Sequence, residues 1–372
     1  MHQTEHAGGA RILATYRIAA PLDDRRARAE ALAIEQSVEV PLAAVRTAFV
    51  RDEILARVEA ITEADGGFDV VLSIAAETTG YEISQLINMV FGNGSMHRDV
   101  ELTGLTCPAG YAAHFAGPRF GIDGLRERTG AHGRALTCTA IKPQGLTLDE
   151  LSTLARTFVR AGIDVVKDDH GLTNQSYSRF AERVPVIQRV IDEANRAHGR
   201  RTCYAPTLSG SPSAILEQLR IARECGVGLF LVSPMLIGLP VFAELAGMAG
   251  VPLMTHPTFS GGARIAPDVL LGTLYRMCGA DATTFANHGG RFGFSREVCH
   301  TLVDAARATS PHWKPSLPVA GGGMVTARVD DVLDEYGIDT MLLVGGGLLA
   351  AASVEDESRA FVERVRQYRS RT

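Results

Sequence analysis

The stretch that decides the fold is Gly162-Ile163-Asp164-Val165-Val166-Lys167-Asp168-Asp169-His170. Residues 162–166 predict a short buried strand, because β-branched apolar residues follow a glycine of the kind that ends helices. Four ionisable residues in a row then end this strand. Two carboxylates and an imidazole that converge there suit a hard divalent cation such as Mg²⁺. A structural salt-bridge cluster is the alternative, and spacing alone leaves both interpretations open.

The chain around this stretch alternates between strand and helix patterns from residue 134 onward. Eight short apolar strands are predicted, at 135–142, 163–167, 202–206, 228–233, 252–256, 282–285, 317–320 and 340–344. Amphipathic helices are predicted between them, among others at 147–161, 175–197, 214–224, 267–278 and 296–308. Eight strand–helix units over about 235 residues indicate a closed (β/α)₈ barrel. A doubly wound open sheet is the competing architecture, and the count of eight argues against it.

Residues 1–117 follow a different pattern, which predicts a small α+β domain of the ferredoxin-like type. Strands are predicted at 10–20, 57–61, 68–75 and 100–105, with helices at 23–33 and 83–91. The turn Asp65-Gly66-Gly67 joins the second and third strands. Residues 118–133, rich in glycine and arginine, are the predicted connection to the barrel at 134–372.

Composition narrows the class of protein. The 372 residues have 46% hydrophobic and 21% charged residues and a formal net charge of −5, which is typical of a globular enzyme and gives no reason to expect nucleic acid as a partner. Six cysteines are scattered singly, which argues against a disulfide framework or a zinc site. The sequence offers no secretory signal and no apolar run of membrane-spanning length, so we expect a cytoplasmic protein without a membrane partner.

Polar residues follow several predicted strands, and in a barrel such residues share one mouth. Lys142 follows the first strand and suits a general acid/base or a phosphate partner, with a surface lysine as the alternative. His256 follows the fifth strand, where it contacts substrate or serves the structure. His288 and Arg291 lie in a glycine-rich loop after the sixth strand, which either closes over the mouth or stays solvated.

Glycine triplets follow the last two strands, at Gly321-Gly322-Gly323 and Gly345-Gly346-Gly347. They expose backbone N–H groups beside helix N-termini, an arrangement that binds phosphate. A single triplet is better explained by a tight strand-to-helix turn. Two triplets at the usual phosphate positions of a barrel instead predict a phosphorylated ligand.

These motifs together resemble the large chain of ribulose-bisphosphate carboxylase (RuBisCO). Thr139-Ala140-Ile141-Lys142-Pro143 with Gly145-Leu146 resembles its first barrel strand, and 162–169 resembles its Gly-x-Asp-x-x-Lys-Asp-Asp strand. Glu35-Gln36-Ser37 and Gly92-Asn93 resemble two N-terminal segments that reach the active site of a neighbouring subunit. His256 and both glycine triplets follow in the expected order, so the resemblance covers nearly the whole chain.

The resemblance implies a set of roles. Lys167 would be carbamylated by CO₂ and would bind Mg²⁺ with Asp169, while His170 occupies the position of the third ligand. Lys142 would serve the proton transfers and Asn93 would touch the metal or the substrate. The resemblance also implies a homodimer or a higher homo-oligomer, because Glu35 and Asn93 would complete the partner's site.

Four departures separate this chain from true carboxylases. His170 replaces a glutamate, Gln144 a lysine and Pro257 an arginine, and the loop around His288 and Arg291 has no CO₂-orienting lysine. The carboxylation machinery and a second phosphate clamp are therefore missing, which identifies a RuBisCO-like, non-carboxylating relative. His170 also changes the metal shell, because imidazole is a softer, neutral ligand that can act as an acid/base group instead.

The leading hypothesis for the function is a Mg²⁺-dependent enolising enzyme that acts on a singly phosphorylated ketose or oxo-sugar acid. Among the known activities of such relatives we favour proton transfer of the 5-methylthioribulose-1-phosphate isomerase type over the 2,3-diketo-5-methylthiopentyl-1-phosphate enolase. Decarboxylation, transcarboxylation or hydrolysis of the 3-oxo-isoapionate-4-phosphate type is the alternative. A non-catalytic phosphoester-binding protein is the hypothesis of another class, and His170 is the residue that favours it.

Overall fold

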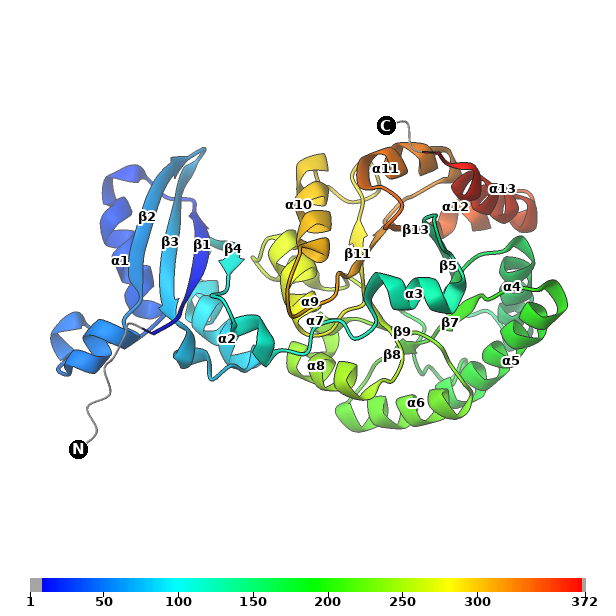
Figure 1. Cartoon of the computed structure of the whole chain (residues 1–372), viewed down its shortest axis with the longest axis horizontal. Helices are drawn as coiled ribbons and strands as arrows, with labels where there is room; N and C mark the ends of the chain where they lie inside the picture. Colours follow the sequence, from blue (N-terminus) through cyan, green and yellow to red (C-terminus); the bar gives the residue numbers. More distant parts are fainter. Residues whose placement is uncertain (1–8, 370–372) are drawn as a thin grey trace. The chain divides into compact units, whose positions relative to one another are not determined.

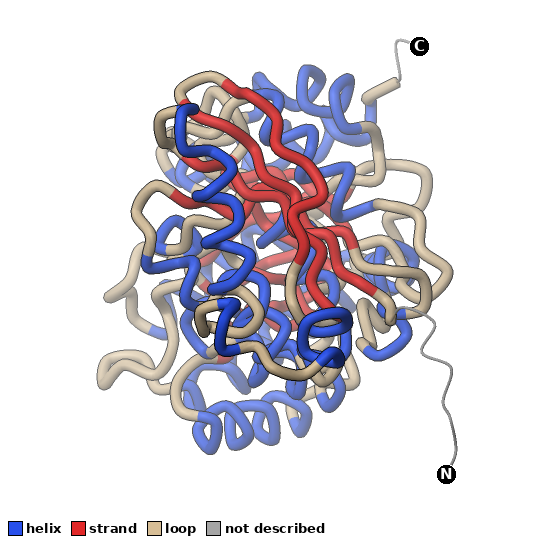
Figure 2. Tube along the Cα trace, turned by 90° about the vertical axis from the view of Figure 1, so that its left-hand side faces the viewer, coloured by secondary structure: helices blue, strands red, loops and turns tan. Residues whose placement is uncertain are grey.

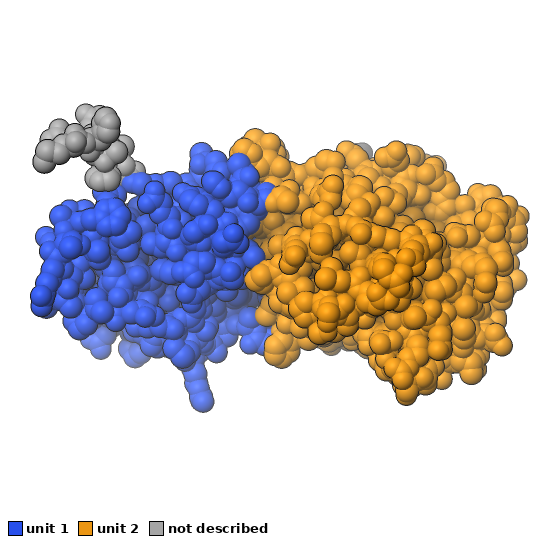
Figure 3. Space-filling model, turned by 90° about the horizontal axis from the view of Figure 1, so that it is seen from below, with its two compact units in different colours: residues 1–115, 260–273 blue, residues 116–259, 274–372 orange. Residues whose placement is uncertain are grey.

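The computed structural model describes residues 9–369, which form two compact units (Figures 1 and 3). The described part of the first unit runs to Phe115 and includes Ser260–Thr273. The second unit contains Ala116–Phe259 and the chain from Leu274 onward. No helix among the described residues has the length and apolar character needed to cross a membrane.

The first unit is built on a four-stranded antiparallel sheet, drawn in red in Figure 2. Its strands are β1 (Arg11–Ile18), β2 (Arg57–Ala64), β3 (Gly67–Ala75) and β4 (Val100–Thr106), in the order β2-β3-β1-β4. Helices α1 (Arg25–Glu35) and α2 (Ile83–Phe91) complete the unit. Alternate residues of β1, from Ile12 to Ile18, are fully buried, which is the face that their spacing predicts.

A segment from the barrel part of the sequence belongs to the first unit. Ile265 forms a parallel bridge with Leu102 of β4. The Arg264 guanidinium donates to the backbone carbonyls of Val100, at 3.0 Å, and of His97, at 2.8 Å. The helix predicted at 267–278 is instead a π-helical stretch, Asp268–Leu274, followed by the short helix α9 (Tyr275–Met277). Contacts far apart in the sequence decide the structure of this segment.

The second unit is a parallel barrel, which confirms the predicted fold class (Figure 1). Its strands are β5 (Leu136–Ile141), β6 (Val165–Asp168), β7 (Cys203–Ala205), β8 (Thr207–Leu208), β9 (Phe230–Val232), β10 (Leu253–Thr255), β11 (Ala282–Ala286), β12 (Leu317–Gly321) and β13 (Met341–Leu343). The third predicted strand is split at Pro206, which has no N–H to donate. β7 pairs with β6 and β8 pairs with β9, so this split strand connects the two ends of the sheet.

Helices surround the barrel. They are α4 (Leu148–Ala161), α5 (Phe180–His198), α6 (Pro212–Glu224), α7 (Pro234–Ile237), α8 (Leu239–Met248), α10 (Arg296–Arg307), α11 (Val329–Tyr336), α12 (Gly346–Leu349) and α13 (Val354–Gln367). Short 3-10 turns lie at Leu22–Asp24, Leu42–Ala44, Ala76–Thr79, Asn93–Met96, Tyr111–His114, Ser260–Gly262 and Thr326–Arg328, and a further π-helical turn lies at Val50–Ile54. Thr147 and Glu150 form a reciprocal capping box at the start of α4.

Residues 118–133, predicted as a connection, differ from that expectation because they contain helix α3 (Gly121–Thr129). Ile122 and Leu125 of this helix are buried and belong to the same apolar cluster as Leu136, Val165 and Leu317 of the strands. Their spacing of three places both side chains on one face of α3. The glycines and arginines around them obscure this pattern in the sequence, and the segment contributes to the barrel core.

Candidate functional site

The candidate site lies at the C-terminal ends of the barrel strands. Lys167 belongs to β6, Asp169 and His170 follow it, and Lys142 and His256 directly follow β5 and β10. Because all barrel strands are parallel, these residues share one end of the barrel. The barrel therefore gathers groups that lie up to 114 positions apart in the sequence.

Lys167 is the most deeply buried cation at this mouth, with 2% of its surface exposed. Its Nζ donates to the backbone carbonyl of Asp168 at 2.9 Å. Burial lowers the pKa of Lys167, and the positive charge of Lys142 adds to that lowering. A lowered pKa raises the population of the neutral amine, which is the form that reacts with CO₂.

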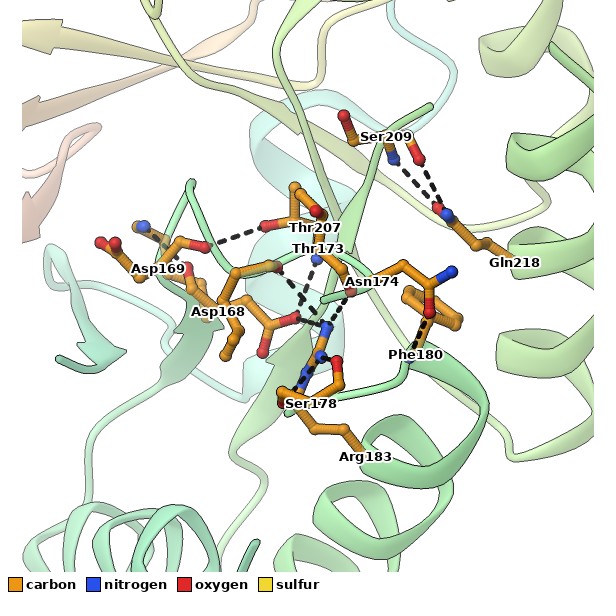
Figure 4. A network of polar contacts seen from close by, with 12 residues as sticks. Asp168, Asp169, Thr173, Asn174, Ser178, Phe180, Arg183, Thr207, Ser209 and Gln218 are labelled. Atoms are coloured by element: carbon orange, nitrogen blue, oxygen red, sulfur yellow. Dashed lines mark hydrogen bonds and ion pairs between the residues drawn. The ribbon is translucent and has the colours of Figure 1, made fainter. Parts of the chain in front are cut away.

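The two neighbouring aspartates have opposite surroundings (Figure 4). Asp168 is fully buried and accepts hydrogen bonds from Tyr204 Oη at 2.6 Å and Arg183 Nη2 at 3.1 Å. The same Arg183 nitrogen donates to the Thr173 carbonyl at 2.8 Å, which ties down the loop before α5. Burial raises the pKa of Asp168, an effect that the charge of Arg183 opposes. Asp168 is thus the salt-bridge carboxylate of the alternative interpretation, and it faces away from the mouth.

Asp169 is 18% exposed, and its Oδ1 lies 3.6 Å from Nδ1 of His170. Partial burial raises the pKa of Asp169, but the contact with His170 and the charges of Lys167 and Lys142 outweigh it and lower the pKa to about 2. Asp169 is therefore an ionised carboxylate at neutral pH. It has the charge and the oxygen ligands that a hard cation requires.

The rings of His170 and His256 stack, with centroids 4.3 Å apart and planes inclined by 7°. Burial, together with the charges of Lys167 and His170, lowers the pKa of His256 to about 2, so this imidazole is neutral. Its Nδ1 lies 2.5 Å from Oγ1 of Thr258, which fixes the ring orientation. Thr258 carries no sequence signal beyond its position two residues after His256.

The donor set at the mouth fits a carbamate-assisted magnesium site. Among residues 9–369, no three His, Cys, Asp or Glu side chains are arranged to hold a metal on their own. Asp169 and His170 provide two candidate donors, and a carbamate on Lys167 would add the oxygen that the unmodified side chains lack. The buried amine of Lys167, whose pKa is lowered by burial, is the group suited to that modification.

The glycine triplets lie beside these groups. A Cβ built on Gly345 would lie 3.1 Å from Nζ of Lys142, so the second triplet lies against the predicted proton-transfer lysine. Gly322 and Gly323 have φ of +78° and +117°, which favour glycine, and Arg291 donates its backbone N–H to the Gly322 carbonyl at 2.7 Å. Gly321, Gly346 and Gly347 continue these two turns at the ends of β12 and β13. The structure therefore brings Arg291 to the predicted phosphate glycines.

His288 is not part of this group. Its Nε2 lies 2.7 Å from Oε2 of Glu335 on α11, and Arg296 also contacts that carboxylate, at 2.8 Å. Arg328 donates to the backbone carbonyl of His288 at 2.7 Å. The His288 side chain thus anchors the loop to the outer helices. Its sequence neighbourhood gives no sign of Glu335, which lies 47 positions away.

Glu35 and Asn93, predicted to reach a partner's site, meet in the first unit. Asn93 Nδ2 donates to Glu35 Oε1 at 2.8 Å and also to Glu39 Oε1. Glu39 has a φ of +53°, which is unusual for a residue other than glycine, and sequence analysis did not select it. The structure thus adds a second carboxylate to this pair.

Comparisons with known proteins agree with this geometry. Residues 121–257 match the family described as ribulose bisphosphate carboxylase large chain, catalytic domain. A ribulose bisphosphate carboxylase-like protein 1 from Rhodopseudomonas palustris is 47% identical over 352 residues, which cover 94% of this chain and 96% of that protein. The 5-methylthioribulose-1-phosphate isomerase of Rhodospirillum rubrum is 43% identical over 359 residues, which cover 95% of this chain and 96% of that enzyme.

A solved structure extends the similarity to the fold. The crystal structure of a Rubisco-like protein from Rhodopseudomonas palustris superimposes with a TM-score of 0.91 at 41% identity, covering 98% of this chain and 99% of that one. The similarity therefore includes both compact units.

Proposed function

The chain belongs to the RuBisCO-like protein family, and on that premise we propose that it is an isomerase of a singly phosphorylated ketose, of the 5-methylthioribulose-1-phosphate type. Such an enzyme moves a proton between neighbouring carbons and fixes no CO₂. The observation that carries the proposal is the convergence of Lys142, Lys167 and Asp169 at a mouth bordered by both glycine triplets. The relative of that name, similar over nearly its whole length, supports this choice among enolising reactions.

The phosphate of the substrate would bind at the glycine turns. Backbone N–H groups of Gly322, Gly323 and the second triplet would donate to it. The exposed side chain of Arg291 would join them: a Cβ built on Gly323 would lie 3.3 Å from its Cγ, and its guanidinium lies over the Phe292 ring, 5.5 Å from the centroid. Multiple N–H donors together with a guanidinium favour a phosphate dianion. Anchoring this end of the substrate orients its carbonyl carbon and the neighbouring carbon toward Lys142 and Lys167.

Lys167, as its carbamate, and Asp169 would hold Mg²⁺, with His170 as the third donor. When bound, this cation supplies positive charge that stabilises the enediolate formed after proton removal. Lys142 moves the proton: its Nζ takes the proton from the carbon next to the carbonyl and returns it to the neighbouring carbon. Neutral His256 orients a substrate hydroxyl without adding charge.

Nuclear magnetic resonance in D₂O tests this function. The intact protein is incubated with Mg²⁺, bicarbonate and 5-methylthioribulose 1-phosphate. We expect deuterium incorporation next to the carbonyl and a product with the same number of carbon atoms. Lys142→Met should lower turnover by at least about 1,000-fold, while Lys314→Met, which removes an exposed lysine, should stay within about twofold.

Other outcomes identify the other hypotheses. A product shorter by one carbon from an oxo-sugar acid phosphate would replace the isomerase with a decarboxylase. An intact protein that fails to bind Mg²⁺ at millimolar concentration, and turns over none of these substrates, would instead support a phosphoester-binding protein.

The proposal includes a homo-oligomer with shared sites, to which Glu35 and Asn93 contribute. Their hydrogen bond with each other, and the second carboxylate of Glu39, form a polar group in the first unit. Mixing the inactive variants Lys142→Met and Asn93→Ala tests this sharing. Recovery of activity on subunit exchange supports a shared site, whereas a mixture that stays inactive while exchanging subunits argues against it.

A further inference from the structure

Away from the mouth, an open cavity of about 680 Å³ has three arginines and a histidine among the residues that line it. Arg134, Arg366 and Arg369 form part of its wall, together with His132 and Tyr368. The residues that line this cavity lie just before barrel strands or at and just after the end of α13. Arg134 lies two residues before β5, and Ile338 of the same wall lies three residues before β13. The cavity therefore lies at the N-terminal ends of the strands, opposite the candidate active site.

Three arginines meet beside this cavity. A Cβ built on Gly162 would lie 3.3 Å from Nη2 of Arg366 and 3.5 Å from Cζ of Arg200, so both guanidinium groups reach the same point. Arg134 adjoins them, since its charge and that of Arg200 both lower the pKa of Arg366, after burial as the largest cause. Like charges this close repel one another unless an anion lies between them.

Two carboxylates among the described residues act on this group, since the charges of Asp164 and Glu363 both raise the pKa of Arg366 and oppose the lowering. Asp164 accepts from Arg134 Nη1 and Nη2, both at 2.7 Å, and from the backbone and hydroxyl of Thr137 at 2.8 and 2.9 Å. Three of these contacts fall on Oδ2 and one, from Arg134 Nη2, falls on Oδ1. Asp164 is thus hydrogen-bonded to Arg134, and no hydrogen bond from Arg200 or Arg366 to a carboxylate is found among residues 9–369.

The donors of these two arginines remain unused within the described chain. Nε of Arg200 is buried and has no hydrogen-bond partner among residues 9–369. No ion pair or side-chain hydrogen bond of the Arg366 guanidinium is found in that range. A buried donor without a partner costs about 1–3 kcal/mol, which a bound acceptor would offset.

We propose that Arg134, Arg200 and Arg366, the basal arginine cluster, bind a phosphate group, either as the free ion or on a small ester. A phosphate offers several acceptor oxygens in a tetrahedral arrangement, which suits several guanidinium forks better than the two oxygens of one carboxylate. This site is separate from the phosphate glycines at the mouth and does not depend on the proposed isomerase activity.

Arginine modification tests the proposal at residue level. The intact wild-type protein is treated with phenylglyoxal, with and without inorganic phosphate, and each arginine is followed by peptide mass spectrometry. We expect phosphate to slow modification of Arg366 at least about fivefold by occupying the cluster. Arg359 lies on the same helix and pairs only with Glu355 within it, so its modification rate should change less than about twofold. Equal protection of both arginines would overturn the proposal.

Matched variants provide the second readout. Arg366→Gln should remove much of the rise in unfolding temperature that phosphate gives the wild type, whereas Arg359→Gln, with the same loss of charge, should retain it. Binding at the mouth remains in both variants and therefore cancels in the comparison. An equal rise in both would overturn the proposal. Glycerol 3-phosphate serves as a second probe, which distinguishes the free ion from an ester. If it binds the cluster more tightly than inorganic phosphate does, the natural ligand is a phosphate ester.

Discussion

Two aspartates flank strand β6, one at each end of the barrel, and they have different contacts. Asp164, just before the strand, accepts four hydrogen bonds at 2.7–2.9 Å from Arg134 and Thr137. Asp169, just after it, has a 3.6 Å contact with His170 and remains partly exposed. The difference between these two carboxylates teaches that Asp164 uses its charge to hold the barrel together, whereas Asp169 keeps its charge available for a ligand.

The largest expected effect is a loss of activity at the C-terminal end. Asp169→Asn should lower turnover in the proposed isomerase reaction about 10,000-fold, equivalent to about 5 kcal/mol of transition-state stabilisation, because the proposed magnesium site would lose a charged donor. The free energy of unfolding should fall by no more than about 2–3 kcal/mol, because the interactions that lower the pKa of Asp169 are lost. Turnover and urea denaturation measure both effects. Normal turnover in a folded variant would remove Asp169 from the site.

The second prediction tests the neighbouring aspartate. Asp168→Asn should destabilise the fold by about 3–5 kcal/mol, because it leaves the buried guanidinium of Arg183 without its counter-charge. Urea denaturation measures this loss. The double variant Asp168→Asn with Arg183→Met should recover part of it, since no unpaired charge then remains. If Asp168→Asn is as stable as Asp169→Asn, then Asp168 is not the structural carboxylate of this pair.

A smaller effect is expected at the N-terminal end. Asp164→Asn should cost about 2–3 kcal/mol of unfolding free energy, because Arg134 stays partly solvated and can rehydrate. Turnover should remain within about twofold. Asp339→Asn is the matched control at this end, because its pair with Arg126 is 56% exposed on the aspartate side and should contribute below about 1 kcal/mol. A large loss of turnover in Asp164→Asn would contradict the separation of the two ends.

The smallest effect concerns acid stability. The pKa of His256 falls from 6.5 to about 2 in the fold, so below pH 6.5 the unfolded chain binds a proton that the folded chain does not. This residue should therefore cost the wild type up to about 1.4 kcal/mol of stability per pH unit as pH falls below 6.5. The free energy of unfolding, measured with urea at pH 6 and pH 4, should fall less steeply in His256→Asn than in the wild type. His132→Asn, which changes an exposed histidine at the other end, should decline like the wild type.

Much of the fold could be predicted because its signals are local. Helix α2 begins and ends at the predicted residues Ile83 and Phe91, and each predicted barrel strand corresponds to an observed one. Helix α5 begins at Phe180 rather than at Gln175, because Arg183 holds the preceding loop through the Ser178 and Thr173 carbonyls. That anchor depends on Asp168, which joins it only in the folded barrel.

The candidate site could be predicted only in part. Lys142, Lys167, Asp169 and His256 all follow or end strands, and a parallel barrel places such residues at one mouth. His288 has the same kind of position, yet its side chain pairs with Glu335 on an outer helix. Strand-end position thus predicts which end of the barrel a residue occupies, but not the direction of its side chain.

The sequence by itself determined the barrel, the glycine turns and the set of ionisable residues at the strand ends, because alternation, apolar runs and glycine positions act over a few residues. Only the tertiary structure decided how the charges are divided. It paired Asp168 with Arg183, left Asp169 open, and placed Arg200 beside Arg366 near Gly162. Electrostatic partners depend on distance in space and on burial, and neither quantity can be obtained from the spacing of residues along the chain.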